Sequence, residues 1–203
     1  MAAALTCGAA PRAEIIDRVV ATVGPRAVTL SDVRAALALG FVPADAGGEQ
    51  GQAVLRAITD RVLMALEVER YGGTAPDEAT VTRRLDALTR RLGPSDVAGI
   101  MARTGLDEPR LRAVVREDLA IEKYIEERFG GAAQPTDDEV RDHYLGHPEA
   151  FTRAGVAIPF AEAEPAARQA LVEQRKRALI EGWLEGLRRR TPVDVKPSAS
   201  QPR

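Results

Sequence analysis

The segment from Ile16 to Val33, IDRVVATVGPRAVTLSDV, constrains the fold of this chain more than any other stretch. It contains two runs of extended character, 19–23 and 27–30, which are separated by Gly24-Pro25 and an arginine. Two such runs across a short Gly/Pro turn predict a β-hairpin, and Ser31 is placed to cap the helix that follows. A two-stranded hairpin is only marginally stable in water, so it needs a third strand or a helix against it.

The late segment Val193-Asp194-Val195 is the strand candidate that could complete this hairpin. Pairing between them would join the two ends of the chain in one small sheet. The helices between them would then form a single domain over residues 14–195. The alternative is that these three residues belong to a frayed tail, because residues 196–203 have the composition of a disordered tail.

The residues between the hairpin and this strand have a mainly helical pattern, with apolar residues three or four positions apart and Gly or Pro at the breaks. Thr136 and Glu139 form a capping-box pattern, and Ser95 and Asp107 are expected N-caps. We therefore expect a mainly α fold with a small β-sheet. The expected helices span residues 32–39, 52–71, 76–92, 95–104, 107–129, 136–145 and 165–190, with a loop at 43–51 and linkers at 130–135 and 155–159.

The composition argues against several classes of partner. The chain has 203 residues and a net charge of -2, which provides no basic field for nucleic acid. We interpret its arginine runs, such as Arg83-Arg84 and Arg188-Arg189-Arg190, as solvated helix faces. No run reaches the roughly 18 apolar residues of a membrane span. The single cysteine, Cys7, excludes an intramolecular disulfide and a cysteine metal cage.

Residues 1–13, MAAALTCGAAPRA, are small and apolar. They are similar to the end of a secretory signal peptide, although the basic start of such a peptide is missing. One interpretation is a signal-peptide remnant whose start lies upstream of Met1, and the other is a disordered Ala-rich leader. Lipid attachment at Cys7 is less favoured, because Ala4 rather than a leucine lies three residues before it.

The sequence offers little reactive chemistry. His143 and His147 are four residues apart, a spacing that can hold zinc on one helix face. Gly146 and Pro148 disturb the helix there, so we interpret the pair as a solvated helix end. The chain has no G-x-S-x-G nucleophile motif, and its Gly-Gly pairs lack the Lys-Ser/Thr of a phosphate loop. We predict no catalytic residues, no bound metal and no cofactor.

Three further segments carry a family resemblance: PDEATVTRRLDAL at 76–88, GLDEPRLRAVVREDLAIEKYIEERF at 105–129 and PTDDEVRDHYLGHPEAF at 135–151. Their order, between the opening hairpin and a returning helix and strand at 160–195, resembles the chaperone core of the SurA-type periplasmic folding factors. These are relatives of the parvulin prolyl isomerases. The resemblance implies one chaperone domain in two parts, 14–151 and 160–195.

The chain departs from this family at one point. Only the eight residues 152–159 separate the two parts, whereas a folded domain needs about 50 or more. The resemblance therefore implies that the parvulin isomerase domain is absent here. None of the family's catalytic residues can be carried over.

The resemblance implies an ATP-independent chaperone of the periplasm that binds unfolded or extended polypeptides, with exported or outer-membrane proteins as clients. Phe41, Met101 and Phe129 are the candidate peptide contacts, because adaptable apolar side chains suit a promiscuous groove. Two alternatives stay open. One is a prolyl isomerase relative that retains activity, and the other is a helical adaptor with one specific protein partner.

Overall fold

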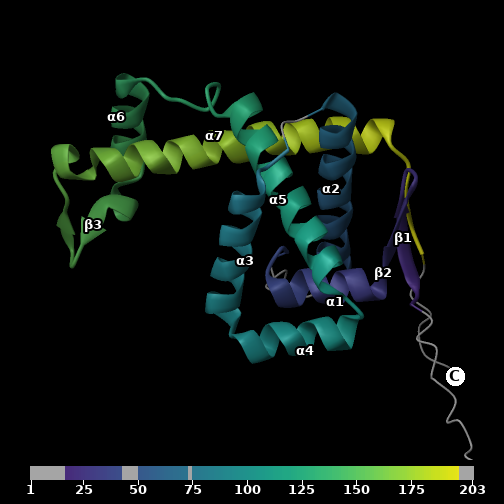
Figure 1. Ribbon diagram of the computed structural model, residues 1–203. Coiled ribbons are helices and arrows are strands. Elements are labelled where there is room, and N and C mark those ends of the chain that lie inside the picture. The colour runs from purple at the N-terminus through teal and green to yellow at the C-terminus, as the bar shows by residue number, and fades with distance from the viewer. Residues whose placement is uncertain (1–16, 43–49, 73–74, 197–203) are drawn as a thin grey trace, which may run out of the picture.

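The computed structural model describes residues 17–42, 50–72 and 75–196 (Figure 1). These residues contain seven α-helices, a three-stranded sheet and a two-stranded sheet, which confirms the mainly α fold with a small β-sheet. None of these helices combines the length and the apolar composition needed to cross a bilayer. The elements are β1 (Val19–Val23), β2 (Arg26–Thr29), α1 (Leu30–Leu39), α2 (Gln50–Tyr71), α3 (Glu78–Leu92), α4 (Pro94–Thr104), α5 (Glu108–Phe129), α6 (Asp137–Gly146), the 3-10 helix η1 (Pro148–Phe151), β3 (Thr152–Arg153), β4 (Val156–Ala157), α7 (Phe160–Arg190) and β5 (Val193–Val195).

The three-stranded sheet joins the two ends of the described chain, in the order β2-β1-β5. β1 is antiparallel to both neighbours, with Ala21 opposite Val195 and Val23 opposite Val193. Ala21 and Val23 are fully buried. The predicted third strand is thus confirmed, and residues 193–195 belong to the fold rather than to a frayed tail.

Two backbone hydrogen bonds at the ends of β5 set its register on β1. The Gly24 N–H donates to the Pro192 carbonyl at 2.9 Å, and the Lys196 N–H donates to the Val20 carbonyl at 2.9 Å. In an antiparallel ladder, hydrogen-bonded and non-hydrogen-bonded pairs alternate. Both bonds involve even-numbered residues, so the backbone N–H and C=O groups of the even-numbered residue of β5, Asp194, face β1.

This register divides the three residues of β5 into two kinds. Asp194 lies opposite Thr22 and forms the hydrogen-bonded pair. The N–H and C=O groups of Val193 and Val195 point the other way, toward the open edge of the sheet. β5 has no further neighbouring strand among the described residues.

α2 and α7 pack against this sheet and enclose the main hydrophobic core (Figure 1). Trp183 of α7 lies at its centre, with its ring centroid 5.5 Å from that of Tyr124 and 5.7 Å from that of Phe129. A second core lies among α1, α3, α4 and α5. Its buried side chains include Leu39, Val81 and Val115.

α6, η1, β3, β4 and the first turns of α7 form what we call the outer unit. In Figure 1, α7 runs across the molecule with the outer unit at one end and the main sheet at the other. The unit has its own small core of Val140, Phe151, Ala163 and Ala167, which shares no buried residue with the main core or the second core. The eight residues 152–159, expected to be mainly a linker, make a tight hairpin, and the Ile158 N–H donates to the Phe151 carbonyl at 2.8 Å.

Two of the predicted helix caps are confirmed. Asp107 accepts a hydrogen bond at the start of α5, and Thr136 and Glu139 form the predicted capping box of α6. The prediction that Ser31 caps α1 is wrong, because Thr29 is the N-cap and forms a complete capping box with Asp32.

Two other boundaries also differ from the expectation. Ser95 does not cap α4, whose N-cap is Gly93 with no side-chain hydrogen bond. α7 begins at Phe160, where the resemblance placed the start of the returning helix, and not at Pro165, where the local pattern placed it. Pro165 lies inside the helix and lacks a backbone N–H donor. The leader at 1–13, residues 43–49 of the expected loop and the tail beyond Lys196 lie outside the described residues.

The register of β5 yields a first prediction. Asp194→Pro should lower the free energy of unfolding by about 1–3 kcal/mol, because it removes the donor that faces Thr22 and leaves a strand carbonyl unpaired. Val195→Pro should change it by about 0.5 kcal/mol or less, because that N–H points to the open edge, where proline is tolerated. Urea denaturation of both variants measures the difference, and equal losses would contradict the register.

The outer unit yields a prediction on pH. The Arg175 guanidinium donates to the Glu139 carboxylate at 2.6 Å, and this bond, with the Thr136 N–H, lowers the pKa of Glu139 from 4.5 to about 2. The folded-state pKa is depressed, so the stabilisation is present above pH 4.5 and is lost as the pH falls toward 2.

An NMR titration of the Glu139 carboxyl checks this value. Arg175→Gln should move its pKa back toward 4.5. Arg177→Gln is the control, because Arg177 bonds to the Glu173 carbonyl instead, and it should leave the pKa unchanged. An unshifted pKa in Arg175→Gln would disprove the assignment.

Candidate functional site

The described residues contain no group of three or more His, Cys, Asp or Glu side chains that could hold a metal ion. His143 and His147 do lie together, with ring centroids 4.3 Å apart. His147 Nδ1, however, lies 2.9 Å from the His143 carbonyl oxygen, which engages that nitrogen within the helix end. Partial burial lowers the pKa of His143, and the neighbouring His147 lowers it further. This geometry fits the interpretation of the pair as a helix end.

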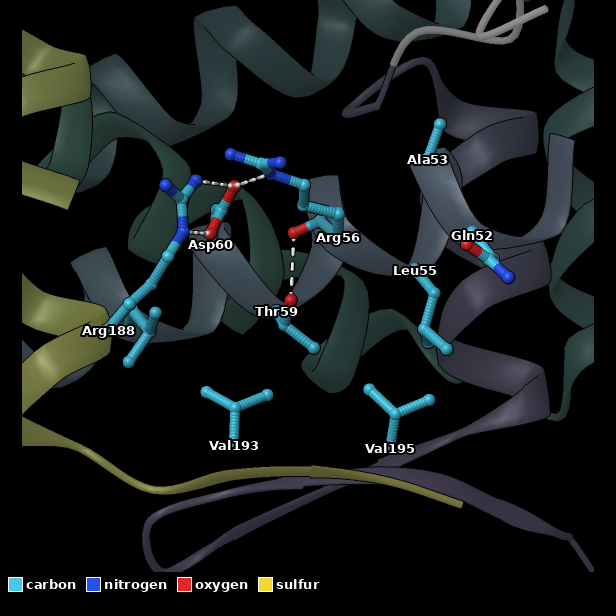
Figure 2. Close-up of a pocket in the computed structure, with 10 residues that line it drawn as sticks. Gln52, Ala53, Leu55, Arg56, Thr59, Asp60, Arg188, Val193 and Val195 are labelled. Atoms are coloured by element: carbon cyan, nitrogen blue, oxygen red, sulfur yellow. Dashed lines mark hydrogen bonds and ion pairs between the residues drawn. The ribbon is translucent and has the colours of Figure 1, made fainter. Parts of the chain in front are cut away.

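A groove of about 1160 Å³ lies between α2 and β5, at the opposite end of α7 from the outer unit. Figure 2 shows Val193 and Val195 pointing from β5 toward Leu55 and Thr59 of α2. Leu63 adds to the apolar lining. Val195 is 50% exposed, so the groove is open to solvent at this side chain.

One wall of the groove is polar, but its charges are paired with one another. Arg188 Nε and Nη2 donate to the two carboxylate oxygens of Asp60 at 2.8 and 2.6 Å. Arg188 also donates to Glu181 at 2.9 Å, and this bond lowers the pKa of Glu181. Arg56 contacts the same two acids, at 4.0 Å from Asp60 and 3.3 Å from Glu181 (Figure 2 shows Asp60 between the two arginines).

The sequence determines part of this arrangement locally. Arg56 and Asp60 lie four residues apart on α2, which places them on one helix face. Thr59 satisfies its own hydroxyl by donating to the Arg56 carbonyl at 2.8 Å. The wall therefore holds two arginines and Asp60, and Glu181, which lies outside the lining, pairs with both arginines; the floor offers aliphatic side chains. Such a surface is suited to binding an uncharged, apolar segment.

The structure does not bring the three sequence-predicted contacts together in this groove. Phe129 is only 8% exposed and packs against Trp183 in the main core. Phe41 and Met101 are half-buried at the second core, and the Arg61 guanidinium lies 5.2 Å from the centroid of the Phe41 ring. None of the three lines the groove.

Sequence reasoning missed the residues that do line it, chiefly Leu55, Val193 and Val195. The alternation of apolar and charged residues in Val193-Asp194-Val195 could have predicted that the two valines share one face of the strand. Which helix covers that face depends on the tertiary packing.

The arginine runs are less solvated than expected. Arg84 donates to Glu122 of α5 at 2.9 Å, and Arg188 binds Asp60 as described. Arg91 donates to the Leu39 carbonyl at 2.6 Å. The interpretation of these side chains as solvated faces is therefore incomplete, because several of them connect separate elements.

No protein-family model matches this chain, and no curated protein resembles it closely enough to be a relative. The resemblance to the SurA-type chaperone core consequently stays a prediction.

The Arg188–Asp60 pair gives a prediction on stability. Arg188→Met should lower the free energy of unfolding by about 1–3 kcal/mol, because the Asp60 side chain, 13% exposed, loses two hydrogen bonds. Arg56→Met is the matched control, since the Arg56 side chain is 65% exposed, and it should cost about 0.5 kcal/mol or less. Urea denaturation measures both, and a larger loss in the Arg56 variant would show that the groove wall is held differently.

Proposed function

We propose that this protein is an ATP-independent chaperone that binds extended segments of unfolded polypeptides in the groove between α2 and β5. The observation that carries the proposal is the groove itself, which is open, about 1160 Å³ in volume, apolar on its floor and lined on its wall by charges that are paired within the protein. This volume exceeds the range of about 300–1,000 Å³ typical of small-molecule pockets. A polypeptide segment fits such a surface better than a small metabolite does.

The expected affinity is low for any single segment. Burying one valine or leucine side chain contributes about 1.5–3 kcal/mol. Ordering each peptide residue opposes this by about 1–2 kcal/mol of backbone entropy. Binding of this kind is reversible and tolerant of sequence, which suits a protein that must release many different clients.

The resemblance supports the cellular setting of the proposal. The order of hairpin, helices and returning strand is similar to that of the SurA-type chaperone core, which implies periplasmic location and exported or outer-membrane proteins as clients. The tight hairpin at residues 152–159 supports the absence of an inserted isomerase domain at this point. We therefore propose binding without prolyl isomerisation.

An aggregation assay tests this function. The purified protein should suppress aggregation of a chemically unfolded outer-membrane protein at near-stoichiometric ratios. Val195→Asp should weaken suppression by more than about threefold, because a carboxylate in the groove loses hydration when an apolar segment covers it. Leu145→Asp is the matched control: this leucine is 65% exposed but belongs to the outer unit, so suppression should be unchanged.

Three results would redirect the proposal. No suppression by the unmodified protein would rule out the chaperone. Accelerated cis–trans exchange of a proline peptide would favour the isomerase alternative. A pull-down that recovers one stoichiometric partner, rather than many clients, would favour the helical adaptor.

A further inference from the structure

The open edge of β5 has unused hydrogen-bonding capacity. Among the described residues, no hydrogen bond uses the N–H or C=O groups of Val193 and Val195. Asp194, between them, is paired with Thr22 of β1. An edge strand with free donors and acceptors is a template for another extended backbone.

This edge runs along the groove. The side chains of Val193 and Val195 form part of the groove floor, and they point toward α2 (Figure 2). A strand added to the edge would lie about 4.8 Å from β5. Its residues opposite the two valines would point to the same side, over the floor of the groove. The free backbone groups and the apolar lining can therefore be satisfied by one ligand.

We propose that the groove binds its polypeptide by strand addition, with the bound segment pairing antiparallel to β5 as a fourth strand of the sheet. The proposal rests on the function proposed above and specifies its binding mode. The N–H and C=O groups of Val193 and Val195 supply the backbone bonds, and the groove accepts alternate side chains of the segment. A helix could not bind in this way, because its backbone groups are already paired.

The charges near the edge define which segment fits. Arg188 is paired with Asp60 and Glu181, so an additional buried charge in the segment would meet no free partner at this wall. Asp194 points to the opposite side of the sheet, where its side chain is 63% exposed and ion-paired with Lys196. Because an exposed ion pair of this kind contributes little, the carboxylate can still interact with a residue placed directly opposite it on an added strand. The segment should carry aliphatic residues opposite the two valines and a basic or neutral residue opposite Asp194.

The same charge argues against a second copy of this chain as the occupant. Antiparallel pairing of two β5 strands, with the valines of one bonded to the valines of the other, places Asp194 directly opposite Asp194 of the other copy. Like charges in directly opposed positions are destabilising. A client segment with lysine or arginine at this position places a second cation beside Asp194, in addition to Lys196, instead of a second carboxylate.

Fluorescent peptides with a Val-Lys-Val centre, flanked by serines, test the mode by anisotropy. Methylation of the two valine nitrogens should weaken binding by about tenfold or more, because it removes both donors to β5. Methylation of the lysine nitrogen is the matched control, since that N–H points away from β5, and binding should be retained. Replacing lysine by glutamate should weaken binding by about two- to fivefold.

Variants of the protein complement the peptides. Val195→Pro and Val195→Ala both remove the valine side chain, but only the proline removes the edge donor. Val195→Pro should bind the peptide about tenfold more weakly than Val195→Ala. Equal binding by the two variants, or by the two methylated peptides, would overturn strand addition.

Amide hydrogen exchange distinguishes a bound peptide from the other possible occupants of the β5 edge. The amides of Val193 and Val195 should exchange rapidly in the free protein and become protected when the Val-Lys-Val peptide is added. Protection before peptide addition would mean that the same chain or a second copy already occupies the edge, and would overturn the proposal. If the unmodified protein suppresses aggregation but these amides stay unprotected with peptide, the chaperone function stands and strand addition fails.

Discussion

The pairing of β1 with β5 is the contact on which the rest of the structure depends. It brings together segments from opposite ends of the chain, and such non-local pairing must overcome a substantial loop-closure entropy. The apolar burial that follows compensates for it, because Leu184 and Leu187 of α7 enter the same core as Val23. The hairpin, marginal alone, is supported on one side by β5 and on its face by α2 and α7.

A chain of half-buried ion pairs connects the helices below this sheet. Arg26, at the start of β2, binds Glu117 of α5, and Arg61 of α2 binds Asp118 of α5. Burial raises the pKa of Asp118, although Arg61 opposes that shift. Arg84 of α3 lies 3.7 Å from the same carboxylate. Because desolvation offsets much of the attraction, these pairs contribute more to the alignment of the helices than to net stability.

The outer unit shows how α7 can carry a separate small core. Val140, Phe151 and Ala167 pack together in a cluster that is separate from the main core and the second core. The Tyr144 hydroxyl donates to the Ile158 carbonyl at 2.8 Å and ties α6 to the returning chain. A short hairpin therefore suffices to connect the two halves of the chain at this point.

The sequence by itself determined the features that depend on neighbouring residues: the helical stretches, the caps at Asp107 and Thr136, and the hairpin at residues 19–29. Prediction from the sequence was wrong at the start of α1, where Ser31 and Thr29 are both possible N-caps. It also missed the hairpin at 152–157, because strands of two residues are too short to show an alternating pattern. Only the tertiary structure decided which face of Val193-Asp194-Val195 meets α2 and which edge stays open. Those outcomes depend on how α7 returns the chain to β1, because the groove is built from residues that are distant in sequence.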